Sequence, residues 1–244
     1  MVQPDVVMED IRQQVEAGAE HITFGDPDFF NGPGHALRLV ESFHQEFPNL
    51  TYDVTIKIEH LLAHREKLRR LAETGCLFVT TAVEEVDDNI LGKLEKRHTQ
   101  ADFVDAVYAT RAAGLTLSPT FIPFHPWTTT YGFVDLLSLL SALALIENVA
   151  PVQLGIRLLI PKGSRILELS EINQFLGDFD AVKLSYRWKP ADPRLDEMHS
   201  KVYAAIQLGV SEGASSRSIF EQVWILAHNA CEQSAPALPP ERAE

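Results

Sequence analysis

The sequence predicts an α/β protein, a partial (β/α)6 barrel of parallel strands with a helical extension at its C-terminal end. Short runs of β-branched and aromatic residues alternate with segments of helical periodicity, an order typical of parallel strands joined by right-handed crossovers. Several predicted strands also have one polar face, whereas the strands of a flat sheet covered on both sides are apolar throughout. This one-sided polarity favours an open barrel around a ligand cavity.

The first half of the chain shows this alternation most clearly. Its predicted helices are residues 4–17, 34–47 and 60–74. Its predicted strands are residues 21–24, 51–59 and 77–83. Apolar residues recur at helical spacing in each helix, and Gly18 and Gly75 are stop signals after two of them. In the second strand Val54, Ile56 and Ile58 alternate with polar residues, which predicts one apolar and one polar face.

The second half continues the alternation as far as Pro161. Its predicted helices are residues 87–94, 100–113 and 131–145, and its predicted strands are residues 115–124 and 152–160. Beyond Pro161 we predict a short helix over 172–176, a sixth strand over 181–186, and two helices over 194–209 and 215–231. The predicted domains are a barrel over 1–187, a helical extension over 188–232 and a disordered, proline-rich tail over 233–244.

Composition restricts the partners and the compartment. The net charge of -13 and the pI of about 5.1 argue against a general nucleic-acid surface. The most apolar segment, residues 133–146, is shorter than a membrane span and contains Asp135. Two cysteines far apart in sequence, Cys76 and Cys231, do not form a disulfide scaffold, and no secretory leader opens the chain. We therefore expect a cytoplasmic protein without a nucleic-acid or membrane partner. Its small-molecule or peptide substrate is unknown.

The sequence HITFGDPDFFNGP, residues 21–33, is the first candidate site. Its strand ends abruptly at Gly25, and Asp26 and Asp28 then bracket Pro27. The carboxyl ends of parallel strands are where ligands bind in α/β folds. These carboxylates could bind an ammonium group or a divalent cation. The alternative is that they only cap the turn, since Asp is an ordinary turn former.

Three segments together resemble the radical SAM superfamily over about 160 residues. Gly25-Asp26-Pro27-Asp28 stands at the place of the family's second-strand motif, which contacts the amino group of the methionine part of S-adenosylmethionine. AVEEVDDNILGKL, starting at Ala82, with the following Lys-Arg-His-Thr, resembles the acidic end of the fourth strand in cobalamin-binding and methylthiotransferase-like members. PTFIPFHPWTT, starting at Pro119, resembles the fifth-strand segment that lies beside the adenosine.

The resemblance implies a partial TIM-like barrel that binds S-adenosylmethionine for reductive cleavage by a [4Fe–4S] cluster and for radical chemistry on an unknown substrate. The implied cofactor-binding residues are Gly25, Asp26, Pro27, Asp28, Lys57, Glu84, Thr120, His125 and Arg157. It gives no catalytic residue and no metal ligand within this chain.

Several of these residues also have a structural interpretation. Glu84 would accept hydrogen bonds from ribose hydroxyls, or would start a helix as Glu85, Asp87 and Asp88 do. His125 would contact adenine at the cavity mouth, or would only order a turn. Further alternatives concern lumen residues and one histidine pair. Lys57 could pair with Glu59. Arg157, beside Gln153 in the lumen, could hold the carboxylate of a ligand or form a salt bridge. His60 and His64 have the spacing of a zinc pair but fit a solvated helix face better.

The family's cysteine triplet, C-x-x-x-C-x-x-C, is absent. Cys76 and Cys231 cannot supply the thiolates that an iron–sulfur cluster needs, so we predict that this chain alone does not bind the cluster. We expect the native protein to extend upstream through a strand and the triplet, and the similar members also carry a cysteine-containing tail. Two alternatives stay open. One is a non-catalytic barrel remnant that binds a small ligand or a partner, and the other is a metal-assisted hydrolase or aldolase that uses Asp26, Asp28 and Glu84.

Overall fold

A computed structural model of the chain describes residues 2–240 and divides into two compact units. The first unit comprises residues 1–83 and 101–119, and the second comprises residues 84–100 and 120–244. The α/β class and the parallel sheet predicted from the sequence are confirmed, and the barrel is not closed. The domain limits predicted at residues 187 and 232 remain predictions.

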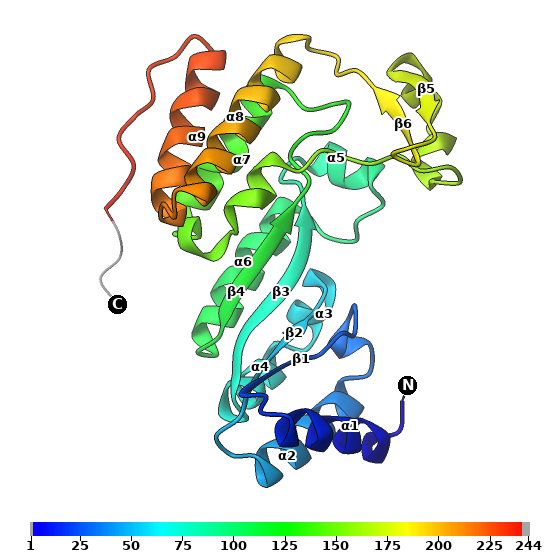
Figure 1. The fold of residues 1–244 in the computed structure, drawn as a ribbon, viewed down its shortest axis with the longest axis vertical. Helices are drawn as coiled ribbons and strands as arrows, with labels where there is room; N and C mark the ends of the chain where they lie inside the picture. The colour runs from blue at the N-terminus through cyan, green and yellow to red at the C-terminus, as the bar shows by residue number, and fades with distance from the viewer. Residues whose placement is uncertain (1, 241–244) are drawn as a thin grey trace. The chain divides into compact units, whose positions relative to one another are not determined.

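A four-stranded sheet with the order β1-β2-β3-β4 organises the fold (Figure 1). Its strands are β1 (His21–Thr23), β2 (Thr51–Thr55), β3 (Cys76–Glu84) and β4 (Thr116–Phe121). The β1–β2 and β2–β3 pairs are parallel, with Thr23 opposite Asp53 and Thr55 opposite Thr80. Because chain order equals strand order, each helical crossover adds one strand to the same edge, as in a barrel.

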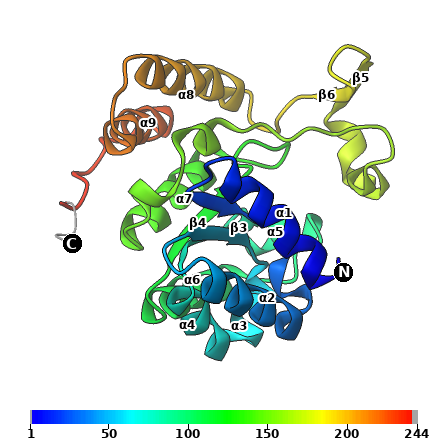
Figure 2. The same cartoon turned by 60° about the horizontal axis from the view of Figure 1, so that its bottom comes forward.

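The first unit also contains five α-helices among its described residues. They are α1 (Pro4–Glu16), α2 (Pro33–Glu46), α3 (Ile58–Ala63), α4 (Arg65–Glu73) and α6 (Gln100–Ala112), with the 3-10 helix η1 (Phe29–Asn31) before α2. Figure 2 shows α3, α4 and α6 together on one side of β3 and β4. Tyr52 of β2 packs 5.5 Å from Phe43 of α2, ring to ring, and its hydroxyl contacts Thr74 Oγ1 at 2.7 Å. Side chains alternate along a strand, so Thr51, Asp53 and Thr55 project from the opposite, polar face.

Two predictions in this region are wrong in detail. The strand predicted over 51–59 ends at Thr55, because Ile58 begins α3. The helix predicted over 60–74 is divided at His64, whose φ of -126° and ψ of 31° are not helical. Ile58 is buried all the same, so its apolar spacing indicated burial and not strand structure.

The second unit is mainly helical. Its α-helices are α5 (Asp88–Lys93), α7 (Thr130–Ala142), α8 (Arg194–Ser211) and α9 (Ser216–Ala230). Its 3-10 helices are η2 (Ile146–Asn148), η3 (Pro151–Gly155), η4 (Arg165–Glu168) and η5 (Ser170–Gln174). Helices α7, α8 and α9 lie side by side (Figure 1). Gly209 permits the close approach of α8 and α9, because a Cβ there would lie 2.6 Å from Ile219 Cγ1.

The two last predicted strands differ from the structure. Residues 152–160 form η3 and then one isolated parallel bridge between Phe124 and Arg157. Pro151, which favours a first helical turn, starts this 3-10 helix. The segment predicted as a sixth parallel strand belongs to an antiparallel hairpin of β5 (Leu176–Asp180) and β6 (Ser185–Trp188).

The C-terminal stretch lies against α9. Residues 233–240 have no regular secondary structure, and the Trp224 indole N–H donates to the Pro236 carbonyl at 2.8 Å. The rest of the tail that we predict to be disordered, residues 241–244, lies outside the described residues.

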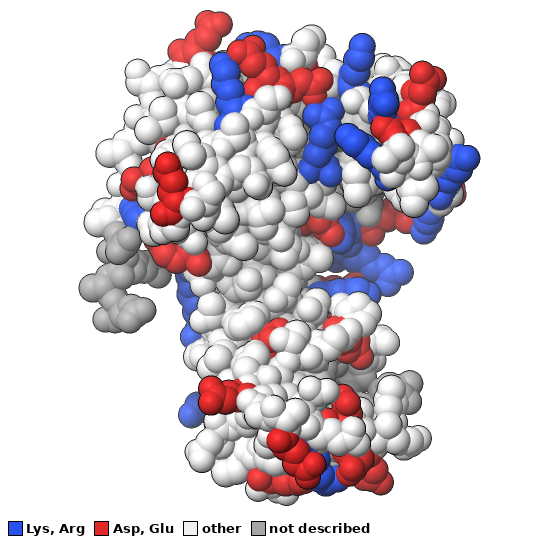
Figure 3. All heavy atoms as spheres, viewed as in Figure 1, with Lys and Arg blue, Asp and Glu red and all other residues white. Residues whose placement is uncertain are grey.

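Within residues 2–240 no helix is both long enough and apolar enough to cross a membrane. On the face shown in Figure 3, basic and acidic side chains are interspersed over both units.

One histidine of α8 makes stability depend on pH. His199 packs 4.6 Å from Phe124, ring to ring, and burial lowers its pKa from the ordinary 6.5, although a contact with the Gly155 carbonyl opposes the shift. The folded chain therefore binds a proton at His199 less readily than the unfolded chain does. The contribution of neutral His199 to the free energy of unfolding is complete above about pH 6.5 and is lost as pH falls through the lowered pKa. We expect the urea midpoint to fall more between about pH 7.5 and about pH 5.5 in the parent than in H199Q. Equal falls would contradict this.

Candidate functional site

The loop after β1 carries the two predicted carboxylates, and the structure gives them different surroundings. Asp26 is exposed, and its Oδ1 accepts a hydrogen bond from the Asp28 backbone N–H at 2.9 Å. Asp28 is only 5% exposed, and the buried Phe29 and Phe30 follow it directly. Asp26 therefore stabilises the turn, as the capping alternative proposed, while Asp28 is held inside the unit.

Asp28 lies between a lysine and a histidine of the first unit. Its Oδ2 is 2.8 Å from His60 Nδ1 and 3.5 Å from Lys57 Nζ, and its Oδ1 accepts from the Lys57 backbone N–H at 3.4 Å. The His60 contact is not aligned as a hydrogen bond, so among the described residues Asp28 Oδ2 and His60 Nδ1 have no hydrogen-bond partner. The buried Oδ2 atom therefore has ion-pair contacts with Lys57 and His60 but no aligned hydrogen bond.

Gly25 and Asp26 instead line a cavity of about 380 Å³ within the first unit. Its walls include the apolar side chains of Phe24, Phe29 and Leu39, and its polar residues include Asn31 and His35. A cavity of this size can hold a small organic group. Pro27 is exposed in the same loop.

A polar network on the β1–β2 face was not predicted from the sequence. Asp53, which is 6% exposed, accepts from His21 Nε2 at 2.9 Å and from the Thr23 hydroxyl at 2.6 Å. His21 Nδ1 in turn lies 2.8 Å from Thr51 Oγ1. The available signal was the period-two polarity of both strands, which parallel pairing places on one face.

Glu84 ends β3 in the second unit with a φ of 70°. Its carboxylate is 2.9 Å from Lys96 Nζ, and its carbonyl accepts from the Ile122 N–H at 2.9 Å. A left-handed conformation costs a residue with a Cβ about 1 kcal/mol or more. Strain of this kind is concentrated at functional sites, so Glu84 keeps its place as a candidate ligand contact.

His125 is buried and not at a cavity mouth, since only 1% of it is exposed. Its Nε2 lies 2.8 Å from Glu85 Oε2, and Glu85 itself is 6% exposed. Glu85 was expected only to start a helix, and the pattern of the sequence contains no signal for this long-range pair. The capping role fits Asp87, which accepts from the backbone N–H groups of Asn89 and Ile90 at 2.7 and 3.4 Å.

Arg157 forms the salt bridge that was the alternative to a ligand contact. Its guanidinium donates to Asp196 at 2.7 Å and to the Trp188 carbonyl at 3.1 Å, and it lies 3.8 Å from the Trp188 ring centroid. Gln153, expected beside it in a strand, accepts from the Phe121 N–H at 3.2 Å. Thr120 is half-buried on β4.

The thiols of this chain do not fit a [4Fe–4S] cluster. Cys76 and Cys231 are both free and buried, and one belongs to each unit. Burial, together with the charge of Asp53, raises the pKa of Cys76 to about 12, which disfavours the thiolate that ligates iron. Among residues 2–240 no group of three or more His, Cys, Asp or Glu side chains could hold a metal ion.

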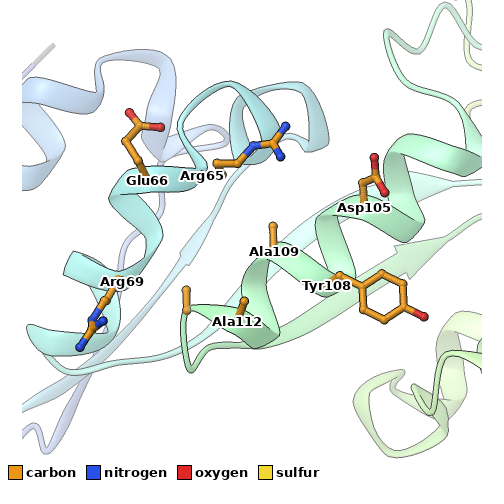
Figure 4. A pocket seen from close by; sticks show the side chains of 8 residues that line it. Arg65, Glu66, Arg69, Asp105, Tyr108, Ala109 and Ala112 are labelled. Atoms are coloured by element: carbon orange, nitrogen blue, oxygen red, sulfur yellow. The ribbon is translucent and has the colours of Figure 1, made fainter.

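A larger groove of about 510 Å³ lies between α4 and α6 (Figure 4). Its lining includes Arg65, Arg69, Asp105 and Tyr108, and no predicted site residue lines it. It opens between helices, whereas ligands of α/β folds bind at strand ends.

Comparisons with known proteins agree with the fold. The family model described as the Radical SAM superfamily matches residues 1–139. The cobalamin-dependent S-adenosylmethionine radical enzyme OxsB, solved with aqua-cobalamin, aligns over 86% of this chain and 38% of its own, with a TM-score of 0.70 and 14% identity.

Two other solved structures have lower scores. The radical S-adenosylmethionine methyltransferase TsrM of Kitasatospora setae, solved with cobalamin and a [4Fe–4S] cluster, aligns over 58% of this chain and 27% of its own, with a TM-score of 0.51 and 17% identity. Elp3 of Methanocaldococcus infernus aligns over 84% of this chain and 52% of its own, with a TM-score of 0.51 and 12% identity. At such identities the likeness concerns the fold alone, and the chain spans about two fifths of OxsB. No curated protein sequence matches it.

Proposed function

Because this chain belongs to the Radical SAM superfamily, we propose that it binds S-adenosylmethionine and forms the cofactor-binding part of a radical SAM enzyme. The observation that carries the proposal is Asp28, a buried carboxylate in the loop after β1 with an oxygen that lacks an aligned hydrogen bond. It stands in the loop that resembles the family's methionine-binding segment.

Asp28 and Lys57 offer charges of both signs to a zwitterionic amino acid group. Asp28 accepts hydrogen bonds from the methionine ammonium, and the Lys57 ammonium, whose side chain is 58% exposed, contacts the methionine carboxylate. Hydrogen bonds to charged groups contribute about 1.5–3 kcal/mol each. S-adenosylmethionine, when reductively cleaved, supplies the radical for hydrogen abstraction, and the chain's own part is to hold and orient it.

The thiolates for a cluster would come from outside these 244 residues, since Cys76 and Cys231 do not fit. We also propose a location in the reducing cytoplasm, which two thiols without a disulfide support. The proposed substrate is a small molecule or a peptide. The same thiol count favours a second candidate function, a non-catalytic barrel that binds a ligand without any cluster. For a metal-assisted hydrolase there is no such support, because Asp26 stabilises a turn and Glu84 pairs with Lys96.

Calorimetric titration of the chain with S-adenosylmethionine tests the proposal. We expect saturable binding that D28N weakens at least about tenfold, equivalent to 1.4 kcal/mol. D26N is the matched control, because the same loop is altered but Asn keeps the oxygen that accepts from the Asp28 N–H, and we expect it to bind as the parent does. Equal losses in both variants, or none in D28N, would contradict the role of Asp28.

A further inference from the structure

Residues 233–240 run back beside α9 (Figure 1). The chain reverses at the end of the helix, where Glu232 has a φ of 56°. The Gln233 N–H donates to the His228 carbonyl at 3.0 Å. The Glu232 N–H donates to the Asn229 carbonyl at 3.1 Å. Together these two bonds form a Schellman motif, which ends the helix and directs the following segment back along it.

The sequence of this segment, QSAPALPP, favours the polyproline II conformation. Proline fixes its own φ at about -65° and disfavours the helical region for the residue before it. Three prolines restrict the segment in this way, Pro236, Pro239 and Pro240. The residues before the first two of them, Ala235 and Leu238, are therefore also extended. A polyproline II helix has three residues per turn, so side chains three positions apart lie on one face.

The burial of the segment has this period of three. Ala235 and Leu238 are half-buried, and the other residues of 233–240 are exposed. Ala237 has the same side chain as Ala235 and is exposed, so burial follows position and not residue type. One face of the extended segment therefore rests on the protein.

Two carbonyl groups of the segment accept hydrogen bonds from α9 at the same spacing. The Trp224 indole N–H donates to the Pro236 carbonyl at 2.8 Å. The Arg217 guanidinium, which also pairs with Glu147 at 3.3 Å, donates to the Pro239 carbonyl. Three residues of polyproline II extend about 9 Å and seven residues of α-helix about 10 Å, so the two contacts are in register. Grooves lined by aromatic side chains recognise proline-rich segments in this conformation.

The Trp224 ring is held by aromatic neighbours one turn away on either side. The Phe220 ring lies 6.3 Å from it in a stacked arrangement, and the His228 ring lies 4.2 Å from it. His228 is itself fixed, because its Nδ1 lies 2.9 Å from the Trp224 carbonyl. The direction of the indole N–H is therefore set by α9, which lowers the entropy lost when an acceptor binds.

We propose that the α9 surface around Trp224 and Arg217 is a docking site for proline-rich segments in the polyproline II conformation, and that residues 235–240 occupy it in cis. A partner of this class has apolar side chains three positions apart and a carbonyl for the indole N–H. It binds after it displaces the chain's own segment, which competes at an effective concentration in the millimolar range. The site lies in the second unit and does not depend on the proposed function.

Three variants of the whole chain test the site. A235D/L238D places two carboxylates on the half-buried face, and the cost of burying these charges releases the segment. S234D/A237D is the matched control, because it adds the same charge at the same spacing on exposed positions. W224F/A235D/L238D also removes the indole N–H but keeps an aromatic ring.

The first measurement is the hydrogen-exchange rate of the Trp224 indole N–H, followed by nuclear magnetic resonance. We expect the exchange in A235D/L238D to be at least about tenfold faster than in the parent, because the hydrogen bond to Pro236 is lost. S234D/A237D is expected to exchange at the parent's rate. Equal rates in the parent and A235D/L238D, or fast exchange in S234D/A237D, would contradict the docking of residues 235–240.

The second measurement is the affinity of each chain for a fluorescein-labelled peptide, QSAPALPP, by fluorescence anisotropy. We expect A235D/L238D to bind this peptide at least about tenfold more tightly than the parent and S234D/A237D, in which the tethered segment occupies the site. Loss of the indole N–H in W224F/A235D/L238D is expected to weaken binding about threefold or more.

No binding of the peptide to A235D/L238D, or equal binding to it and to the parent, would overturn the inference. Equal affinities with and without the Trp224 indole would mean that the peptide binds elsewhere, and would overturn it as well. Sedimentation velocity examines the occupation in cis. A dimeric parent beside a monomeric A235D/L238D would show that the segment docks on a second copy, against the proposal.

Discussion

Anaerobic incubation of the purified chain with ferrous iron and sulfide is expected to leave it without the absorbance at about 410 nm that thiolate-bound clusters give. Two thiols are too few for the cluster, and both are buried. The raised pKa of Cys76 further disfavours the thiolate. The effect is all or none, because a cluster without its ligands does not form.

The matched control for this experiment is C76S/C231S, which has no thiol. We expect the same absorbance from parent and control after desalting, because any iron bound is adventitious. A stable absorbance in the parent that the control lacks would show that these thiols ligate a cluster, and it would contradict the account of the site.

Phe43→Ala is expected to destabilise the first unit by about 3–5 kcal/mol, the range for removing a buried aromatic side chain. Phe43 is fully buried and packs 6.3 Å from Phe24 and 5.5 Å from Tyr52, ring to ring. Phe24 directly precedes Gly25, so the void left by the missing Phe43 ring also loosens the base of the loop that carries Asp28. Urea denaturation followed by circular dichroism measures the change in the free energy of unfolding.

Phe179→Ala is the control for the Phe43 variant. Phe179 lies half-buried in the β5–β6 hairpin, 5.2 Å from Tyr186, ring to ring, and outside the first unit. We expect it to cost less than about 1 kcal/mol, as partly exposed sites do. A Phe43→Ala chain as stable as the Phe179→Ala chain would mean that the aromatic cluster beneath the loop does not support it.

Local pattern was sufficient for most of the fold. The four parallel strands and the long helices followed from apolar spacing and from Gly and Pro punctuation, as at Gly18 and Gly75. The failures occurred where one pattern fits two structures. Val152 and Leu154 alternate as in a strand but lie in a 3-10 helix, and Ile58 is a buried residue of a helix start. In the first case Pro151, a local signal for a first helical turn, starts the 3-10 helix.

The candidate site could be predicted only where its residues are neighbours in the sequence. The loop from Gly25 to Asp28 was located from its own residues, but its division into a turn-stabilising Asp26 and a buried Asp28 depends on Lys57 and His60, about thirty residues away in sequence. The Glu85–His125 pair joins residues 40 positions apart, and periodicity carries no information about such a contact.

The central claim, that Asp28 binds the methionine ammonium, is tested most directly by comparing two ligands on two proteins. S-adenosylmethionine has the ammonium group, and 5′-methylthioadenosine lacks the whole amino acid part. The account predicts that D28N weakens binding of S-adenosylmethionine by about tenfold or more and leaves 5′-methylthioadenosine unchanged. An equal loss for both ligands, or no loss for either, would contradict it.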